Sequence, residues 1–268
     1  AAFTGHAAGT GRIRAQDANL GEDTTGVITV TAGAATRIRI EDSADGSGAE
    51  IDTRTFASGA SFTGYAISRD ASDNFVANVA VTWSLINRTG GVVDSDLVAA
   101  GDARSAAFTG HAAGTGRIRA QDATLGEDTT GVITVTAGAG ARIRIEDRAD
   151  GSGVEIDTRA IASGASFAGY AISRDASNNF VANVAVTWSL IDRTGGVVAG
   201  DLVAAGDARS AAFTGHAAGT GTIRAQHLTL GEDTTGVIAV TAGAGARIRI
   251  EDSADGSGAE IDTRTIAS

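Results

Sequence analysis

The sequence predicts an all-β fold, built as a tandem array of antiparallel β-sandwiches joined end to end. The first observation is a repeat: the hexapeptide that starts at Ala1 returns at Ala106 and Ala211, which gives a period of 105 residues. Only 12 of 105 positions differ between residues 1–105 and 106–210. A unit of about 100 residues is large enough to bury its own core, so we expect separate domains rather than the turns of a solenoid.

The second observation is strand-like alternation in residues 70–85, a stretch that returns almost unchanged at 175–190. Apolar residues at 79, 81, 83 and 85 alternate with small or polar ones, which indicates a strand with one buried face. The turn-forming residues 70–74 and a predicted strand at 62–68 precede it. We therefore predict a strand, a tight turn and a strand. Trp83 and Trp188 are expected to be structural core residues and not a sugar-binding platform.

The third observation is that turn signals recur every 8–12 residues, which predicts seven to eight strands in each sandwich. Each repeat opens with the alternating sequence Arg-Ile-Arg-Ile-Glu. Short strands are also expected at 105–110 and 116–121, with copies at 1–5 and 11–16. Residues 17–26 are predicted to be a loop, and the β-branched residues 27–31 a strand.

The repeat also predicts the domain boundaries. Residues 1–36 form the C-terminal part of one repeat, 37–141 and 142–246 two complete repeats, and 247–268 the N-terminal part of the next. The links at 32–36 and 137–141 are short and lack proline, so we expect limited bending between domains. Both ends fall inside a repeat, and we expect the chain to be a piece of a longer polypeptide.

The composition excludes several kinds of chemistry. Cys, Met, Pro and Lys are all absent, so neither disulfides nor Lys–Asn isopeptide cross-links are expected. The net charge is −11, and Arg supplies the only permanent cations, which argues against nucleic acid and anionic membrane surfaces as partners. No apolar run approaches the roughly 20 residues of a membrane-spanning helix.

Three stretches resemble the bacterial immunoglobulin-like repeats of invasin- and intimin-type surface proteins. They are Asp-Ala-Ser-Asp-Asn-Phe-Val at 70–76, Val-Ala-Val-Thr-Trp at 79–83 and Gly-Thr-Gly-Arg-Ile-Arg-Ala at 114–120. Asp73 and Asn178 stand where that family often has Gly, and Phe75 and Phe180 where it often has Pro. The resemblance implies tandem immunoglobulin-like sandwiches and an extracellular, surface-attached or filamentous protein. It says little about activity, because such domains serve as stalks, spacers and binding tips alike.

Acidic loops provide the candidate metal ligands. Hard oxygen ligands suit Ca²⁺, although the spacing is not that of an EF-hand and the same residue types are common in exposed loops. The candidates are Asp42, Asp45, Glu50 and Asp52, with their copies Asp147, Asp150, Glu155 and Asp157. A second acidic turn at 20–26 is read as solvated in preference to calcium-binding. No other cofactor is predicted.

Other candidate sites lead to no predicted activity. His6, His111 and His216 occupy one loop position in each repeat, without a second His or a Cys that a transition metal would need. His227 replaces an Asp of the other copies. The glycines at 9 and 11 precede a strand and not a helix, so no phosphate site is expected. No nucleophile-elbow motif occurs, and we predict that the chain is not an enzyme.

Near-identity between repeats favours a structural function, since domains that bind different ligands should differ in their loops. The predicted function is therefore an extracellular bacterial fibre or stalk, whose partners are copies of itself, along the chain or laterally. The alternative is an adhesin that binds host or polysaccharide ligands through its loops. That alternative predicts exposed loop aromatics, for which only Phe75 and Phe180 qualify.

Overall fold

The computed structural model describes residues 2–243, 248–254, 256 and 258–262. They belong to two compact units, Ala1–Arg142 with Ser173–Val181, and Ile143–Ile172 with Ala182–Ser268. The predicted boundary at 246–247 and the end of the predicted last segment lie outside the described residues. The predicted repeat boundaries otherwise stay a prediction.

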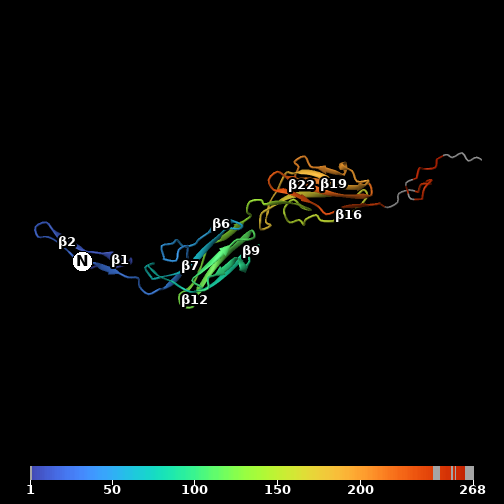
Figure 1. Ribbon diagram of the computed structural model, residues 1–268. Helices are drawn as coiled ribbons and strands as arrows, with labels where there is room; N and C mark the ends of the chain where they lie inside the picture. The colour runs from blue at the N-terminus through green and yellow to red at the C-terminus, as the bar shows by residue number, and fades with distance from the viewer. Residues whose placement is uncertain (1, 244–247, 255, 257, 263–268) are drawn as a thin grey trace, which may run out of the picture. The chain divides into compact units, whose positions relative to one another are not determined.

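Residues 9–30 contain four short strands, and residues 37–136 contain ten (Figure 1). The first four are β1 (Gly9–Gly11), β2 (Arg14–Asp17), β3 (Gly21–Thr24) and β4 (Ile28–Val30). The next ten are β5 (Arg37–Glu41), β6 (Arg54–Ala57), β7 (Ser61–Arg69), β8 (Phe75–Asn78), β9 (Thr82–Gly90), β10 (Leu97–Ala99), β11 (Ser105–Thr109), β12 (Gly114–Asp122), β13 (Gly126–Thr129) and β14 (Ile133–Thr136), with the 3₁₀ turn η1 (Asp94–Asp96) before β10.

Residues 142–241 repeat this order. The strands are β15 (Arg142–Glu146), β16 (Arg159–Ala162), β17 (Ser166–Arg174), β18 (Phe180–Asn183), β19 (Thr187–Gly195), β20 (Leu202–Ala204), β21 (Ser210–Thr214), β22 (Gly219–His227), β23 (Gly231–Thr234) and β24 (Ile238–Thr241), with η2 (Ala199–Asp201) before β20.

The strands of residues 37–136 form two five-stranded sheets with an immunoglobulin-like order. One sheet runs β5-β7-β11-β10, with β8 also paired to β7, and the other contains β9-β12-β14-β6, with β13 also paired to β12. These paths correspond to strands A-B-E-D and C-F-G of an immunoglobulin sandwich. The predicted fold class is thus confirmed: seven strands make the sandwich, and β6, β8 and β13 are short additions. β15–β24 pair in the same way.

A core of twelve buried residues fills the space between the two sheets, and Phe108 and Ile118 in it are fully buried. The members are Ile38, Ile40, Ile51, Ala66, Val81, Leu85, Val92, Phe108, Ile118, Ala120, Ile133 and Val135. The second core consists of the same twelve residue types, each 105 positions later. Trp83 and Trp188 are half-buried and pack against these cores from strand C, and each indole donates a hydrogen bond to a backbone carbonyl.

The strand predicted from Val79 begins later in the structure, as β9 at Thr82, and the separate strand β8 ends just before Val79. β8 pairs with β7 in the first sheet, whereas β9 pairs with β12 in the second. Between them, the amides of Val79 and Val81 donate to the carbonyls of Ala66 and Ala103. The predicted apolar face is present where the chain passes from the first sheet to the second, because Val81 and Leu85 are buried and Trp83 packs beside them.

Two sequence predictions about pairing were incomplete or wrong. One strand pair in each sandwich is parallel, β6 with β14 and β16 with β24, because the first strand of the fold divides and its second half joins the last strand. The predicted loop at 17–26 contains β3, which forms a hairpin with β2, and β13 repeats this hairpin on β12. Its Gly-Glu-Asp-Thr sequence has low β-propensity, and the pairing with the neighbouring strand overrides that preference.

Candidate functional site

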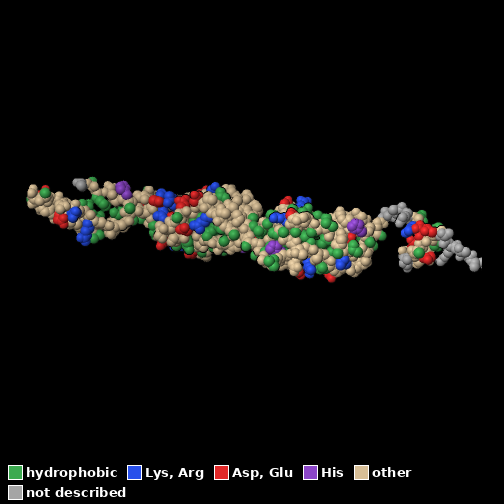
Figure 2. Space-filling view, turned by 90° about the horizontal axis from the view of Figure 1, so that it is seen from above, with side chains coloured by type: hydrophobic (Ala, Val, Ile, Leu, Met, Phe, Trp, Pro, Cys, Tyr) green, Lys and Arg blue, Asp and Glu red, His purple; other side chains and the backbone are tan. Residues whose placement is uncertain are grey.

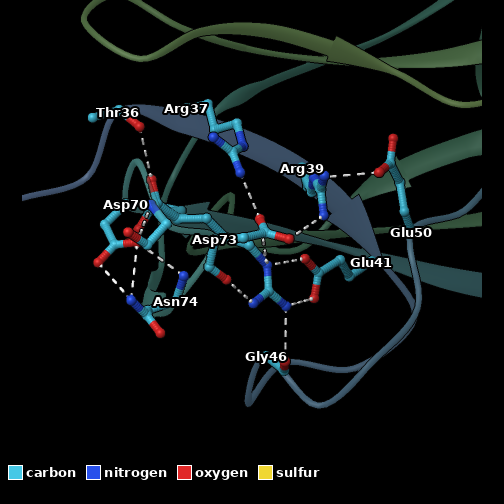
Figure 3. Close-up of polar contacts among 12 residues, drawn as sticks. Thr36, Arg37, Arg39, Glu41, Gly46, Glu50, Asp70, Asp73 and Asn74 are labelled. Carbon is cyan, nitrogen blue, oxygen red and sulfur yellow. Dashed lines mark hydrogen bonds and ion pairs between the residues drawn. The ribbon is translucent and has the colours of Figure 1, made fainter. Parts of the chain in front are cut away.

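The turn between β7 and β8 is the centre of the polar site (Figure 3). The Oδ1 atom of Asp70 accepts hydrogen bonds from the amides of Ser72 and Asn74, both at 2.9 Å. Asp73 has a φ of 70°, a left-handed conformation that Asp and Asn tolerate better than most residues. Asn178 has a φ of 69° at the equivalent position. This backbone conformation explains why Asp and Asn can each occupy the position.

Two arginines of β5 bind the carboxylate of Asp73 (Figure 3). Arg37 approaches Oδ1 at 2.7 Å and Arg39 approaches Oδ2 at 3.0 Å, while Arg39 also pairs with Glu50 at 3.2 Å. The alternation of β5 places both arginines on the face opposite to Ile38 and Ile40. In the second copy, Arg142 donates to the Oδ1 atom of Asn178 at 2.9 Å. The contact is therefore kept although the carboxylate of Asp73 is replaced by a neutral amide.

A buried ion pair lies beneath this turn. Arg69 Nε and Arg69 Nη2 donate to the two carboxylate oxygens of Glu41 at 2.6 and 2.7 Å. Arg69 also donates to the carbonyls of Gly46 and Asp73. The side chain of Glu41 is only 1% exposed, and the hydrogen bond to Glu41 raises the pKa of Arg69 above its usual value. Such a bidentate, multiply bonded pair fixes the ends of β5 and β7 against each other.

Sequence reasoning missed this pair, although a signal was present. The alternation of β5 puts Glu41 on the same side as Arg37 and Arg39, which predicts a solvent-exposed carboxylate. In the structure, Arg69 and the loop that contains Gly46 cover it. A single Arg at the end of the adjacent predicted strand was the available clue.

The acidic residues predicted as calcium ligands already hold their own loop together. Asp45 Oδ1 accepts hydrogen bonds from Ser43 and Ser47, which lower the pKa of Asp45. Asp42 accepts from the amide of Ala49 and pairs with Arg54 at 3.3 Å.

The remaining candidates are spread along the same segment and its copy. Glu50 pairs with Arg39, Glu155 with Arg144, and Asp150 accepts from Ser152. Asp52 and Asp157 lie exposed at the start of the segment that leads to β6 and β16. Within the described residues, no three His, Cys, Asp or Glu side chains gather closely enough to hold a metal ion. Calcium binding by these loops stays a prediction.

In the two later copies of the second acidic turn, one aspartate has a structural role. The Oδ2 atom of Asp128 accepts a hydrogen bond from the amide of Ile40 at 2.7 Å, and Asp233 does the same for Ile145. Desolvation on burial raises the pKa of both carboxyls. These residues link β13 to β5 and β23 to β15, an arrangement that the solvated-turn interpretation did not anticipate.

Two of the repeated histidines, His111 and His216, each bind a buried carboxylate. His111 Nδ1 lies 2.8 Å from Asp96 Oδ1, and His216 lies 2.7 Å from Asp201. Asp96 is buried and its Oδ2 atom accepts from the amide of Val93. The nearby hydroxyl of Ser58 donates to the backbone carbonyl of His111 and not to the ring, so these groups do not form a nucleophile and base pair.

His227 accepts the same hydrogen bonds as the aspartate that occupies its position in the other copies. Its Nδ1 atom accepts hydrogen bonds from the amides of Thr229 and Leu230, both at 3.2 Å. Asp122 accepts equivalent bonds from Thr124 and Leu125 through Oδ1. An imidazole nitrogen and a carboxylate oxygen can both accept at this hairpin turn, which explains the exchange.

The side chain of Phe75 packs against the loop that contains Gly46. It is 37% exposed, and its ring lies so close to Gly46 that a Cβ at residue 46 would be 2.2 Å from Cδ2. The ring therefore packs under the acidic loop, and a φ of 75° at Gly46 lets that loop close over it.

Charged side chains of both signs lie next to each other on the surface of residues 37–141 (Figure 2). The pairs Arg37–Asp73, Arg39–Glu50 and Arg54–Asp42 are examples. Among the described residues, the structure contains no helix of the length and apolar character needed to cross a bilayer.

No family profile and no curated protein sequence matches the chain. Several solved structures are similar to it. Extracellular domains 3–5 of Drosophila OTK are 11% identical with a TM-score of 0.37, over 80% of this chain and 67% of that one. The Escherichia coli adhesin FdeC is 19% identical with a TM-score of 0.32, over 84% and 70%. The D00–D0 domain of intimin is 14% identical with a TM-score of 0.36, over 76% and 99%. Similarities of this size assign neither a family nor a function.

Proposed function

We propose that this chain is part of an extracellular bacterial fibre or stalk, in which near-identical immunoglobulin-like repeats supply length and mechanical continuity. The observation that carries the proposal is that the two cores consist of the same twelve residue types at a spacing of 105 residues. Domains with identical cores have similar intrinsic stability, so an array of them has no weak member.

The polar contacts support the same interpretation. The contacts Arg37–Asp73, His111–Asp96 and Arg54–Asp42 hold neighbouring segments of the sandwich together. The aromatic residue that an adhesin would present, Phe75, packs against Gly46. These contacts favour a structural part over the alternative adhesin.

The proposal is tested on the protein in its native cell. Antibodies against the 268-residue chain should label intact cells, and native material boiled in detergent should migrate far above 27 kDa on a denaturing gel. Labelling only after permeabilisation would overturn the extracellular location. A single band near 27 kDa would replace the long covalent array by a polymer of short subunits. Purified chain that competes with cell attachment to a host or polysaccharide surface would favour the adhesin.

A further inference from the structure

The turn Asp70–Asn74, here called the junction turn, makes a second set of hydrogen bonds that its own fold does not require. The Oδ2 atom of Asp70 accepts from the amide of Gly33 at 2.7 Å. The Asn74 side chain donates from Nδ2 to the carbonyl of His6 at 3.0 Å and accepts at Oδ1 from the amide of Ala8 at 2.8 Å. All three partners precede β5, in the segment that the repeat assigns to the preceding domain.

The same bonds recur 105 residues later. Asp175 accepts from the amide of Gly138 at 2.8 Å, and Asn179 bonds the carbonyl of His111 at 3.0 Å and the amide of Ala113 at 2.9 Å. The second junction turn lies in Ser173–Val181, which belongs to the same compact unit as residues 1–142. Both sets of contacts are therefore internal to one unit.

All three of these bonds reach backbone atoms of the partner segment. Asn is suited to this task because its amide offers both a donor and an acceptor, and Asp70 orients it through bonds of 3.0 and 3.2 Å to Asn74 Nδ2. The links at 32–36 and 137–141 differ in sequence, with Ala35 and Thr36 in the first and Gly140 and Ala141 in the second. The bonds from Gly33 to Asp70 and from Gly138 to Asp175 are nevertheless equivalent. Contacts that use only the backbone tolerate such sequence differences.

We propose that the junction turn is a binding site for the backbone of the preceding repeat in the same chain, and that it couples the folding of neighbouring repeats. The inference goes beyond the proposed function, because it holds wherever the array is located. In arrays of this type, stability is the sum of intrinsic terms and nearest-neighbour terms, and the junction turn supplies a nearest-neighbour term.

The test uses hydrogen exchange of individual amides in the full 268-residue chain. Asn179→Ala removes the direct bonds to Ala113 and His111 and leaves the bond between Asp175 and Gly138. If the turn binds as one unit, the amides of Ala113 and Gly138 should both exchange at least about 10-fold faster, which corresponds to about 1.4 kcal/mol. The amide of Ile118 in the core should not change.

The matched control is Ser177→Ala, which alters a side chain of the same turn while its amide bond to Asp175 remains. It should leave both reporter amides as in the unmodified chain. In the first copy, Asn74→Ala is the test variant and Ser72→Ala its separate control, with the amides of Ala8 and Gly33 as reporters.

Three outcomes would contradict the proposal. Faster exchange of Ala113 alone would mean separate local contacts without coupling, and unchanged exchange at both amides would mean that the bonds have no energetic role. Exchange rates that fall when the protein concentration is raised tenfold would show that the backbone partner comes from a second chain. If Asn179→Ala unfolds the whole unit, the amide of Ile118 will also exchange faster. The experiment is then repeated with Asn179→Ser, which shortens the side chain but keeps a hydroxyl.

Discussion

At the scale of single residues, the buried pair of Arg69 and Glu41 is the polar contact whose loss should be most costly. Replacing Arg69 by Met leaves the Glu41 carboxylate 1% exposed without its partner. Breaking a buried pair from one side typically lowers the free energy of unfolding by about 3–5 kcal/mol. Urea denaturation measures this change. Arg14→Met is the control, since its pair with Glu22 is more than half exposed and is expected to contribute less than about 1 kcal/mol. Equal losses in the two variants would contradict the assignment.

The residue scale is also where sequence reasoning reached its limit. The alternation at 79–85 indicated one apolar face, and Val81 and Leu85 of that face are buried, because burial of one strand face is a local pattern. The partners of Glu41, Asp96 and Asp128 lie between 15 and 88 residues away along the chain. No local pattern encodes those distances, and only for Glu41 did the sequence offer a clue, the Arg at the end of the adjacent predicted strand.

At the scale of elements, Asp128 on β13 joins the two sheets of the first sandwich by binding the amide of Ile40 on β5. Asp128→Ala leaves that amide unpaired in a partly buried place, which should lower the free energy of unfolding by about 1–3 kcal/mol. Asp128→Asn retains an acceptor and removes a charge that burial disfavours, so it should stay within about 1 kcal/mol of the unmodified chain. Chemical denaturation compares the two.

The control for this element is Asp23→Ala. Asp23 occupies the same position of β3, is exposed, and, within the part of the chain that the structure describes, accepts only from the adjacent amide of Thr24. It should change stability by less than about 0.5 kcal/mol. A loss in Asp23→Ala as large as that in Asp128→Ala would show that the strand, and not the bridge between sheets, is responsible.

At the scale of the whole molecule, the junction turns should make stability depend on acid. Hydrogen bonds from Asn74 and Gly33 lower the pKa of Asp70 to about 2, and those to Asp175 outweigh its burial and lower its pKa as well. Because these folded-state pKa values lie below about 3.9, the unfolded value, the stabilisation is complete above about pH 4 and is lost as the pH falls towards 2. The raised pKa values of Asp128 and Asp233 act in the opposite sense, since their protonation on acidification relieves a cost.

The melting temperature should therefore change little between pH 7 and 5 and fall between pH 4 and 2. Circular dichroism during heating at each pH measures it. Asp70→Asn combined with Asp175→Asn should make the fall between pH 4 and 2 shallower, because two carboxyls with lowered pKa values are gone. Other carboxyls whose pKa is lowered, such as those of Asp73 and Asp201, remain. A melting temperature that is constant from pH 4 to 2 in the unmodified chain would contradict the assignment.

Identical cores at a spacing of 105 residues also have a consequence for how such a chain is made. In the unmodified chain β9 pairs with β12, but β22 differs from β12 at only two partly buried positions, 117/222 and 122/227, and offers an equivalent partner. A denatured array that refolds all at once therefore meets several native-like pairings of equal energy, of which one is correct. Synthesis from the N-terminus presents the strands one repeat at a time, so each sandwich can close before its double emerges. Uniform repeats thus make the order of translation part of the information that specifies the fold.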